Sequence, residues 1–307
     1  MSSLGIRWRK LGHVYAPDGK QAWNATHAAA PFAEPLEGDV FQIYFTTRDA
    51  QNRSYICRGR FDLRSRKMVD VEDEPIIAPG QLGLFDDSGA VMGYLLNFKG
   101  AQFLYYLGWN LKVTVPWLNT IGLAIYNPKT KRFEKYGRVP VMDRSDIDPF
   151  SISYPSILEE NGCLKMWYGS NLSWGVTQDE MQHVFKTAYS HDAIHWERTG
   201  RIAVDLIHPN EYALSKPFVL KSKESYEMWY SYRANRDILT YRIGYATSAN
   251  GDDWIRDDEH AGIDVSDEGW DSEMICYPFV FDHKGARYML YNGNAYGKTG
   301  FGLAVVD

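Results

Sequence analysis

The chain has 307 residues, of which 45% are apolar and 15% aromatic, so it can bury a large core, and its length alone would suggest two domains. Its net charge of −6 and the lack of any basic run argue against nucleic-acid binding, which needs clustered Lys and Arg. No apolar stretch is long enough to predict a membrane span, and the N-terminal segment lacks the apolar core of a signal peptide.

A repeat of about 62 residues runs through the whole chain. Its anchors are Pro31, Gly93, Pro155, Pro217 and Pro278, which are 62, 62, 62 and 61 residues apart. Around each anchor the same order recurs: an apolar strand beside the anchor, an aromatic-rich strand, and a strand that ends in small residues. A period of this length over the full chain indicates one repeat architecture rather than separate domains.

In chain order, the five units predict short strands rich in aromatic and β-branched residues, separated by Gly, Asn, Asp and Lys turns. These strands are expected at 30–32, 41–45 and 55–57; at 104–106 and 121–126; at 154–158, 164–168, 185–190 and 196–198; at 216–220, 226–232, 241–248 and 254–256; and at 277–281, 288–291 and 300–304. No long segment has a 3.6-residue period, so few helices are expected. The pattern therefore predicts an all-β, five-bladed β-propeller that forms a single domain over residues 1–307.

The two ends of the chain predict how this ring closes. The fifth unit stops at Asp307 without the Trp-x-Arg strand seen in units three and four, while residues 6–12 have the pattern of residues 194–200. The N-terminal segment is therefore expected to complete the last blade as its outer strand, which would remove an open sheet edge. The alternative is an amphipathic tail that pairs with nothing.

Acidic residues gather just before the anchors, where the innermost strands of a propeller converge on one mouth of the channel. The polar groups at this position are His27, Asp86, Asp87, Asp148, Glu211, Asp271 and Glu273. Carboxylates that face each other across a sugar-sized channel can hydrolyse a glycosidic bond, one as general acid and one as nucleophile or base. Mutual repulsion would also raise the pKa of one partner.

We therefore predict Asp87, Glu211 and Glu273 as the acid/base set. The structural alternative is that each acid caps a turn or pairs with a nearby Lys or Arg, such as Lys216.

The residues predicted to contact a substrate are His27, Arg48, Asp86, Trp109, Arg233, Asp271, Asn292 and Asn294. An Arg can hold a carboxylate or phosphate in bidentate fashion, an Asn suits hydroxyl recognition, and Trp109 could stack on a pyranose. The alternatives are turn chemistry for the two Asn residues and a structural role for His27. His183, His191, His195 and His208 show no metal-ligand spacing and are expected at the surface or in turns. An acid-lined channel could take a cation, but the sequence shows no ligand motif for one, so neither a metal nor a cofactor is predicted.

Several motifs resemble one known superfamily. They are Thr26-His27, residues 85–87, 231–233, 241–246, 269–274 and 291–294. At these residues the chain resembles the five-bladed propeller glycosidases of the arabinanase, levansucrase and invertase superfamily. It is most similar to a bacterial group often found with surface-polysaccharide genes, which is itself similar to the propeller domain of glucosamine inositolphosphorylceramide transferases.

The resemblance implies an Asp on blade one, an Asp on blade two and a Glu on blade three as the catalytic set. This sequence has His27 and residues 28–30 (Ala-Ala-Ala) at the first place, and residues 151–154 (Ser-Ile-Ser-Tyr) at the third. Only Asp86 or Asp87 matches, and acids have accumulated instead on blades four and five.

Taken together, the sequence predicts a glycoside hydrolase-like enzyme acting on a sugar or activated sugar, possibly in surface-polysaccharide metabolism. The main alternative is a non-catalytic propeller that binds a glycan or sugar nucleotide; a scaffold propeller with a plugged channel is a third class. The expected partner is a sugar, oligosaccharide or nucleotide sugar, with no nucleic acid and no membrane. Three Cys without metal spacing favour a reduced, cytoplasmic chain.

Overall fold

A computed structural model describes residues 6–175, 181–208, 210–223, 225–233 and 240–307. These residues form an almost entirely β structure. Twenty strands are accompanied only by the short helical segments Ala22–Asn24, Asp258–His260 and α1 (Asn294–Gly297). The prediction of many short strands with few helices is confirmed for this part of the chain. Within the same part, no helix has the length and apolar character needed to cross a membrane.

The strands fall into antiparallel groups of four. The first two groups are β2 (Thr26–Pro35), β3 (Val40–Arg48), β4 (Ser54–Asp62) and β5 (Lys67–Val71), followed by β6 (Gly89–Phe98), β7 (Ala101–Leu111), β8 (Trp117–Asn127) and β9 (Arg132–Lys135). The next two are β10 (Ile152–Glu160), β11 (Cys163–Ser173), β12 (Gln182–Ser190) and β13 (Glu197–Val204), followed by β14 (Ala213–Lys221), β15 (Tyr226–Arg233), β16 (Arg242–Ser248) and β17 (Trp254–Arg256). The last group is β18 (Cys276–His283), β19 (Ala286–Asn292), β20 (Phe301–Val306) and β1 (Trp8–Tyr15).

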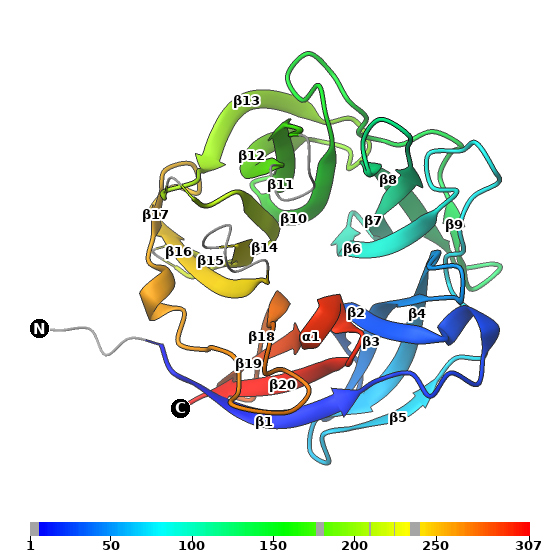
Figure 1. Ribbon diagram of the computed structural model, residues 1–307, viewed down its shortest axis with the longest axis vertical. Coiled ribbons are helices and arrows are strands. Elements are labelled where there is room, and N and C mark those ends of the chain that lie inside the picture. The colour runs from blue at the N-terminus through cyan, green and yellow to red at the C-terminus, as the bar shows by residue number, and fades with distance from the viewer. Residues whose placement is uncertain (1–5, 176–180, 209, 224, 234–239) are drawn as a thin grey trace, which may run out of the picture.

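These groups are connected into three hydrogen-bonded sheets. A single parallel bridge between Ser54 and Gly89 joins the first two groups into one eight-stranded sheet, and a bridge between His183 and Ala213 joins the next two. The last group is a four-stranded sheet of its own. Figure 1 shows the groups arranged around a common centre, with β2, β6, β10, β14 and β18 innermost. One strand of every group therefore faces the central axis.

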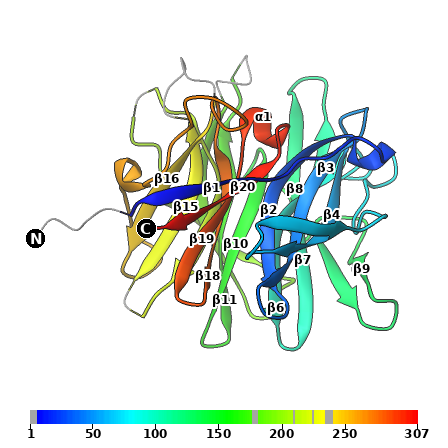
Figure 2. The ribbon, with the colours of Figure 1, turned by 90° about the horizontal axis from the view of Figure 1, so that it is seen from below.

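The N-terminal strand β1 pairs antiparallel with β20, the last strand of the chain, from Trp8 opposite Val306 to Tyr15 opposite Phe301. Figure 2 shows the two strands side by side on the outside of the molecule. The Trp8 side chain is buried and makes an edge contact with Trp229 of β15, with ring centroids 6.2 Å apart. The prediction that the segment around residues 6–12 completes the last group is confirmed, so the first and last strands of the described chain share one sheet.

Each innermost strand carries a β-bulge at its repeat anchor. The ladder register shifts between Ser153 and Ser156 in β10, and at the corresponding place in β2, β6, β14 and β18. The residue before each anchor Pro has a positive φ: 51° at Ala30, 29° at Tyr154, 50° at Lys216 and 56° at Tyr277. Proline lacks an N–H and is tolerated within a sheet at such bulges, which explains why it marks the repeat.

Candidate functional site

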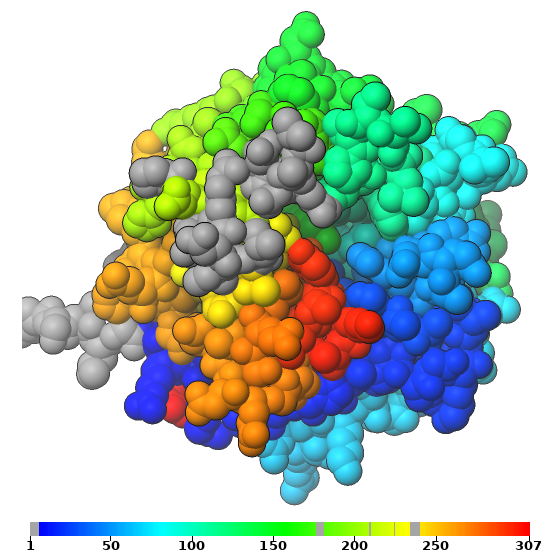
Figure 3. Space-filling model, viewed as in Figure 1, coloured from blue at the N-terminus to red at the C-terminus, as the bar shows by residue number. Residues whose placement is uncertain are grey.

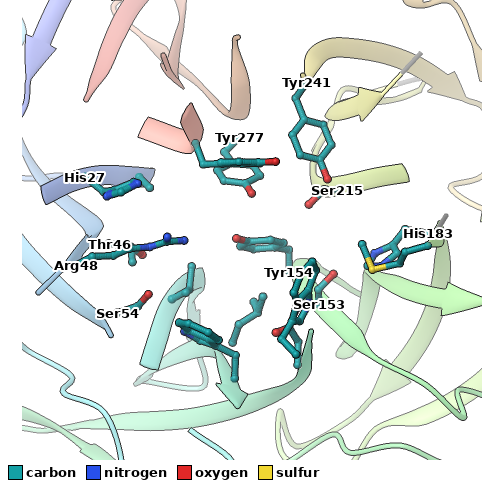
Figure 4. Close-up of a pocket in the computed structure, with 18 of the residues that line it drawn as sticks. His27, Thr46, Arg48, Ser54, Ser153, Tyr154, His183, Ser215, Tyr241 and Tyr277 are labelled. Carbon is teal, nitrogen blue, oxygen red and sulfur yellow. The ribbon is translucent and has the colours of Figure 1, made fainter. Parts of the chain in front are cut away.

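A cavity of about 350 Å³ lies at the centre of the ring, and the space-filling view shows a hollow there (Figure 3). This volume is within the range of small-molecule sites. Its lining comes from several groups and includes His27, Ala29, Thr46, Arg48, Ser54, Val91, Leu107, Trp109, Trp117, Asn119, Ser153, Tyr154, Met181, His183, Ser215, Arg233, Tyr241, Tyr277 and Tyr296. The bulges bring Tyr154 and Tyr277 to the middle of this cavity (Figure 4).

Aromatic rings form much of the cavity wall. Tyr154 and Tyr277 have ring centroids 5.3 Å apart, and Tyr241 lies 6.1 Å from Tyr277. The indole of Trp109 approaches Gly89 so closely that a Cβ there would lie 2.5 Å from Nε1, so this position requires glycine. The rings offer flat apolar surfaces, and their hydroxyl and N–H groups offer hydrogen bonds at the edges.

Two arginines line the cavity without a carboxylate partner among the described residues: Arg48, at the end of β3, and Arg233, at the end of β15. The Arg233 guanidinium stacks on Tyr241, 4.6 Å from the ring centroid, and donates hydrogen bonds to the hydroxyls of Tyr212 (3.1 Å) and Tyr296. Figure 4 shows Arg48 beside His27, on the opposite side from His183.

Two buried histidines also line the cavity, and both are neutral at pH 7. Burial, followed by the charge of Arg48, lowers the pKa of His27 to about 4. Burial and the charge of Arg233 lower the pKa of His183 to about 4 as well. The expectation that His183 lies at the surface or in a turn is wrong, because it is part of β12 and only 7% exposed. Neutral imidazoles can donate or accept hydrogen bonds here without adding charge.

The recurrent acids lie away from the cavity lining, inside their own four-stranded groups. Asp86 accepts hydrogen bonds from Lys135 Nζ (2.5 Å) and the Tyr106 hydroxyl (3.1 Å). Asp271 is held in the same way by Lys10 Nζ (2.7 Å) and the Tyr291 hydroxyl (3.0 Å). In both, a tyrosine from the second strand and a lysine from the outermost strand fix the carboxylate.

Asp148 repeats this arrangement with more partners. Its carboxylate accepts hydrogen bonds from the Tyr168 hydroxyl (2.8 Å), Ser170 Oγ (2.7 Å), Lys186 Nζ (3.0 Å) and Arg198 (3.2 Å). Burial raises the pKa of Asp148, but the hydrogen bonds from Ser170 and Tyr168 outweigh that effect and leave it below its ordinary value. The group is therefore an ionised structural anchor.

Glu211 is the most enclosed of the predicted acid/base set. Arg256 binds it in bidentate fashion, at 2.6 Å to Oε1 and 2.8 Å to Oε2, and the Ile207 N–H donates a further bond of 2.8 Å. The side chains of Arg256 and Glu211 are 4% and 0% exposed. A carboxylate held in this way has no face free for a substrate.

The other two members of that set occupy different surroundings. Asp87 accepts hydrogen bonds from the Gly83 N–H (2.9 Å), Asn110 Nδ2 (2.6 Å) and Ser88 Oγ (3.0 Å). Burial raises the pKa of Asp87, but the hydrogen bonds, of which that from Gly83 has the largest effect, outweigh burial and leave the pKa below its ordinary value. Glu273 is exposed, and its backbone N–H donates to Asn294 Oδ1 at 2.8 Å.

Asn292 and Asn294, which were predicted to recognise sugar hydroxyls, instead form hydrogen bonds with backbone groups. Asn292 accepts from the Ala30 N–H (3.0 Å) and donates to the Tyr296 carbonyl (3.0 Å). Asn294 accepts from the N–H groups of Glu273 and Met274. Both amides therefore shape the chain around α1 rather than offering free groups.

Of the predicted site residues, the structure brings His27, Arg48, Trp109 and Arg233 together around the cavity. It places Asp86, Asp87, Glu211, Asp271, Glu273, Asn292 and Asn294 outside its lining. The sequence reasoning did not single out Tyr154, Tyr241, Tyr277, Tyr296, Ser153, Ser215 and Asn119, which do line it. No Asp or Glu is present in the lining formed by the described residues, and nowhere in that part of the chain do three His, Cys, Asp or Glu side chains cluster to hold a metal.

Lys216 is buried close to the cavity without an acidic partner in the described chain. It is 2% exposed, its Nζ lies 3.4 Å from the Gly93 carbonyl oxygen, and it lies over the Tyr154 ring at 5.8 Å. Burial lowers its pKa to about 7. The structural alternative, that the acids pair with a nearby Lys or Arg, describes Asp86, Glu211 and Asp271. Their partners are Lys135, Arg256 and Lys10 rather than Lys216.

This lysine should give the protein a pH-dependent stability. Since the folded pKa of about 7 lies below the unfolded value, the unfolded state binds the extra proton between these pH values. The charged Lys216 therefore destabilises the folded state by its full amount below pH 7, and this destabilisation disappears as the pH rises toward the pKa of the unfolded state. We expect Lys216→Met to be more stable than the wild type at pH 7, with an advantage that shrinks by up to about 1.4 kcal/mol per pH unit. Urea unfolding at pH 7, 8 and 9 measures this. An advantage that does not change with pH, or an equal trend in the exposed control Lys129→Met, would contradict it.

The same fold occurs in solved glycoside hydrolases. One structure, described as "Glycoside hydrolase", matches with a TM-score of 0.75 and 16% identity over 98% of this chain and 91% of its own. A second, from work on the GH130 family of mannoside phosphorylases, gives 0.72 and 14% over 99% and 95%. A thermostable family-43 glycoside hydrolase gives 0.63 and 17% over 92% and 88%. At these identities the likeness establishes the fold, which is that of the glycoside hydrolase-like propellers.

Sequence comparison places the chain more closely. It is 46% identical over 303 residues to "Uncharacterized protein Rv1502" of Mycobacterium tuberculosis strain H37Rv, covering 98% of this chain and all of the relative. A protein of strain CDC 1551, MT1551, matches at the same level. The chain belongs to the family of these mycobacterial proteins. No model of a known protein family matches it.

Proposed function

We propose that the central cavity is the carbohydrate-binding site of a five-bladed propeller formed by residues 1–307 as one domain. The four-stranded groups would be the blades, with β1 completing the last of them. The carrying observation is the cavity itself, which combines aromatic walls with serine, asparagine, histidine and arginine side chains. Flat rings suit the C–H faces of a pyranose, and convergent polar groups suit its hydroxyls. The glycoside hydrolases among the structural neighbours support the same class of ligand.

The geometry favours binding over hydrolysis by the recurrent acids. Hydrolysis needs two carboxyl groups about 5–9.5 Å apart across the open site. Asp86, Glu211 and Asp271 are instead each paired with a Lys or Arg outside the cavity lining. The set Asp87, Glu211 and Glu273 therefore stands as a competing proposal for an enzyme, and a sugar-binding propeller is the function that we favour.

The wider setting is also a proposal. A site of this kind would suit a cytoplasmic partner in surface-polysaccharide assembly that binds an oligosaccharide, a sugar or a nucleotide sugar without a metal or other cofactor. A role beside sugar transfer is what the resemblance of the sequence motifs to the propeller domain of glucosamine inositolphosphorylceramide transferases would imply.

A screen over glycosides, free sugars and nucleotide sugars tests both functions, with binding and product release measured on the same samples. We expect binding without turnover, and Trp109→Ala should weaken it by about tenfold or more because it removes a stacking surface from the cavity. Trp254→Ala, at a tryptophan outside the cavity lining, is the matched control. Turnover that is lost in Glu273→Gln and Glu211→Gln, while both variants remain folded, would favour the enzyme. Unchanged sugar binding in Trp109→Ala would contradict the proposal that the central cavity is the binding site.

A further inference from the structure

We infer that the cavity recognises an anionic group, a phosphate or carboxylate, held between the guanidinium groups of Arg48 and Arg233. This inference rests on the proposed carbohydrate site and names the class of its ligand. The shared chemistry is an oxyanion on a sugar, as in a sugar phosphate, a nucleotide sugar or a uronic acid.

The first argument is charge. Both arginines line the cavity, no carboxylate of the described chain pairs with either, and none is in the lining. Burial raises the pKa of the Tyr296 hydroxyl while Arg233 and Arg48 each pull it down, so both cations lie within electrostatic reach of one group. His27 and His183 are neutral, so they add no further positive charge to that of the two arginines. In a chain whose net charge is −6, this leaves a local excess of positive charge.

The second argument is a set of buried polar atoms that have no hydrogen-bond partner in the described chain. Four of them belong to cavity-lining residues: Ser54 Oγ, Trp109 Nε1, His183 Nε2 and Arg233 Nε. Arg233 is 9% exposed and His183 is 7% exposed. Buried donors of this kind are costly unless a partner satisfies them. Trp109 Nε1 and Arg233 Nε can act only as donors, and Ser54 Oγ and the neutral His183 Nε2 can also donate, which is what an acceptor-rich oxyanion needs.

The third argument is the way in which Arg233 is held. Its guanidinium lies over the rings of Tyr212, Tyr241 and Tyr296, at 5.4, 4.6 and 5.7 Å. Stacking and two tyrosine hydrogen bonds fix the planar group while leaving its charge unneutralised. A fixed fork of N–H donors matches the geometry of carboxylate and phosphate oxygens.

The test is calorimetric titration of the full chain with matched ligands. The probes are a hexose 1-phosphate and a UDP-hexose for the phosphate source, a hexuronate for the carboxylate source, the neutral hexose, and inorganic phosphate alone. We expect one anionic sugar to bind at least about tenfold more tightly than the neutral hexose, and its affinity to fall with added salt. Arg48→Gln should weaken that binding by about 10- to 100-fold, and it should weaken binding of the neutral hexose by a clearly smaller factor. Arg48→Lys keeps the charge but loses the paired N–H donors of the guanidinium, so its affinity for the anionic sugar should lie between those of the wild type and Arg48→Gln.

Arg64→Gln is the matched control, because Arg64 is exposed in the turn between β4 and β5. Arg233→Lys is the second variant, and its thermal unfolding is recorded beside its binding. Equal affinity for neutral and anionic sugars, or wild-type binding in both Arg48→Gln and Arg233→Lys, would overturn the inference while the carbohydrate site stands. Binding of inorganic phosphate but of no sugar would support the anion site and contradict the carbohydrate proposal. Failure of every probe to bind would overturn both.

Discussion

Replacing Arg256 by methionine is expected to lower the free energy of unfolding by about 3–5 kcal/mol, because Glu211 would remain as an unpaired buried carboxylate. The two side chains are 4% and 0% exposed, and they share two hydrogen bonds. The double variant Arg256→Met with Glu211→Met should recover the part of this loss that comes from Glu211, since hydrophobic residues can replace a buried ion pair with little cost. Asp258, which also pairs with Arg256, still loses its cation in the double variant, so the recovery should be partial. Urea unfolding of the two single variants and the double variant gives the coupling energy.

An exposed ion pair provides the control for this cycle. Arg132 and Glu74 lie 3.3 Å apart with side chains that are 74% and 75% exposed, so Arg132→Met should leave stability nearly unchanged. If Arg256→Met behaved like Arg132→Met, Glu211 would not be a structural anchor, and its assignment to chemistry would gain weight.

Replacing Trp8 by alanine is expected to cost about 3–5 kcal/mol, as for other buried aromatic residues. Trp8 is 6% exposed and its ring contacts Trp229. Its backbone N–H donates to the Gly262 carbonyl at 3.0 Å, and this bond is retained in the alanine variant. Loss of the ring would loosen β1 and expose the edge of β20.

Thermal and urea unfolding measure the effect, with Trp8→Phe as the conservative variant that retains an aromatic ring. Val113→Ala, at a fully exposed position, should show no change. A stability in Trp8→Ala equal to that of the wild type would mean that the N-terminal strand contributes nothing to closure.

The strands could be predicted from the sequence because the same order of apolar and aromatic residues recurs around each anchor of the repeat. Closure by residues 6–12 followed from the same comparison, since they supply the strand that the fifth unit lacks. The pairing of β1 with β20, which begins with Trp8 opposite Val306, confirms this prediction.

The site was harder to predict because a residue can recur at one position of the repeat either for packing within each unit or for ligand binding. Asp86 and Asp148 are 62 residues apart, and so are their tyrosine partners Tyr106 and Tyr168. Such paired recurrence indicates an interaction that several units use for their own packing, since Asp271 and Tyr291 form the same bond. The residue before the anchor differs between units: Tyr154 and Tyr277 line the cavity, whereas Lys216 and Ala30 at the same position do not. Sequence alone does not show that a bulge turns this position toward the axis.

The bulges also separate what holds the molecule together from what it can bind. At the four bulges that contain a proline, the residue before it leaves the regular ladder, with φ between 29° and 56° at Ala30, Tyr154, Lys216 and Tyr277. The carboxylates that brace the groups lie several residues earlier and do not share these contacts. Substitutions at the bulge positions can therefore change the size and polarity of the central chamber while the bracing stays intact. A scaffold arranged in this way can acquire a new ligand one position at a time.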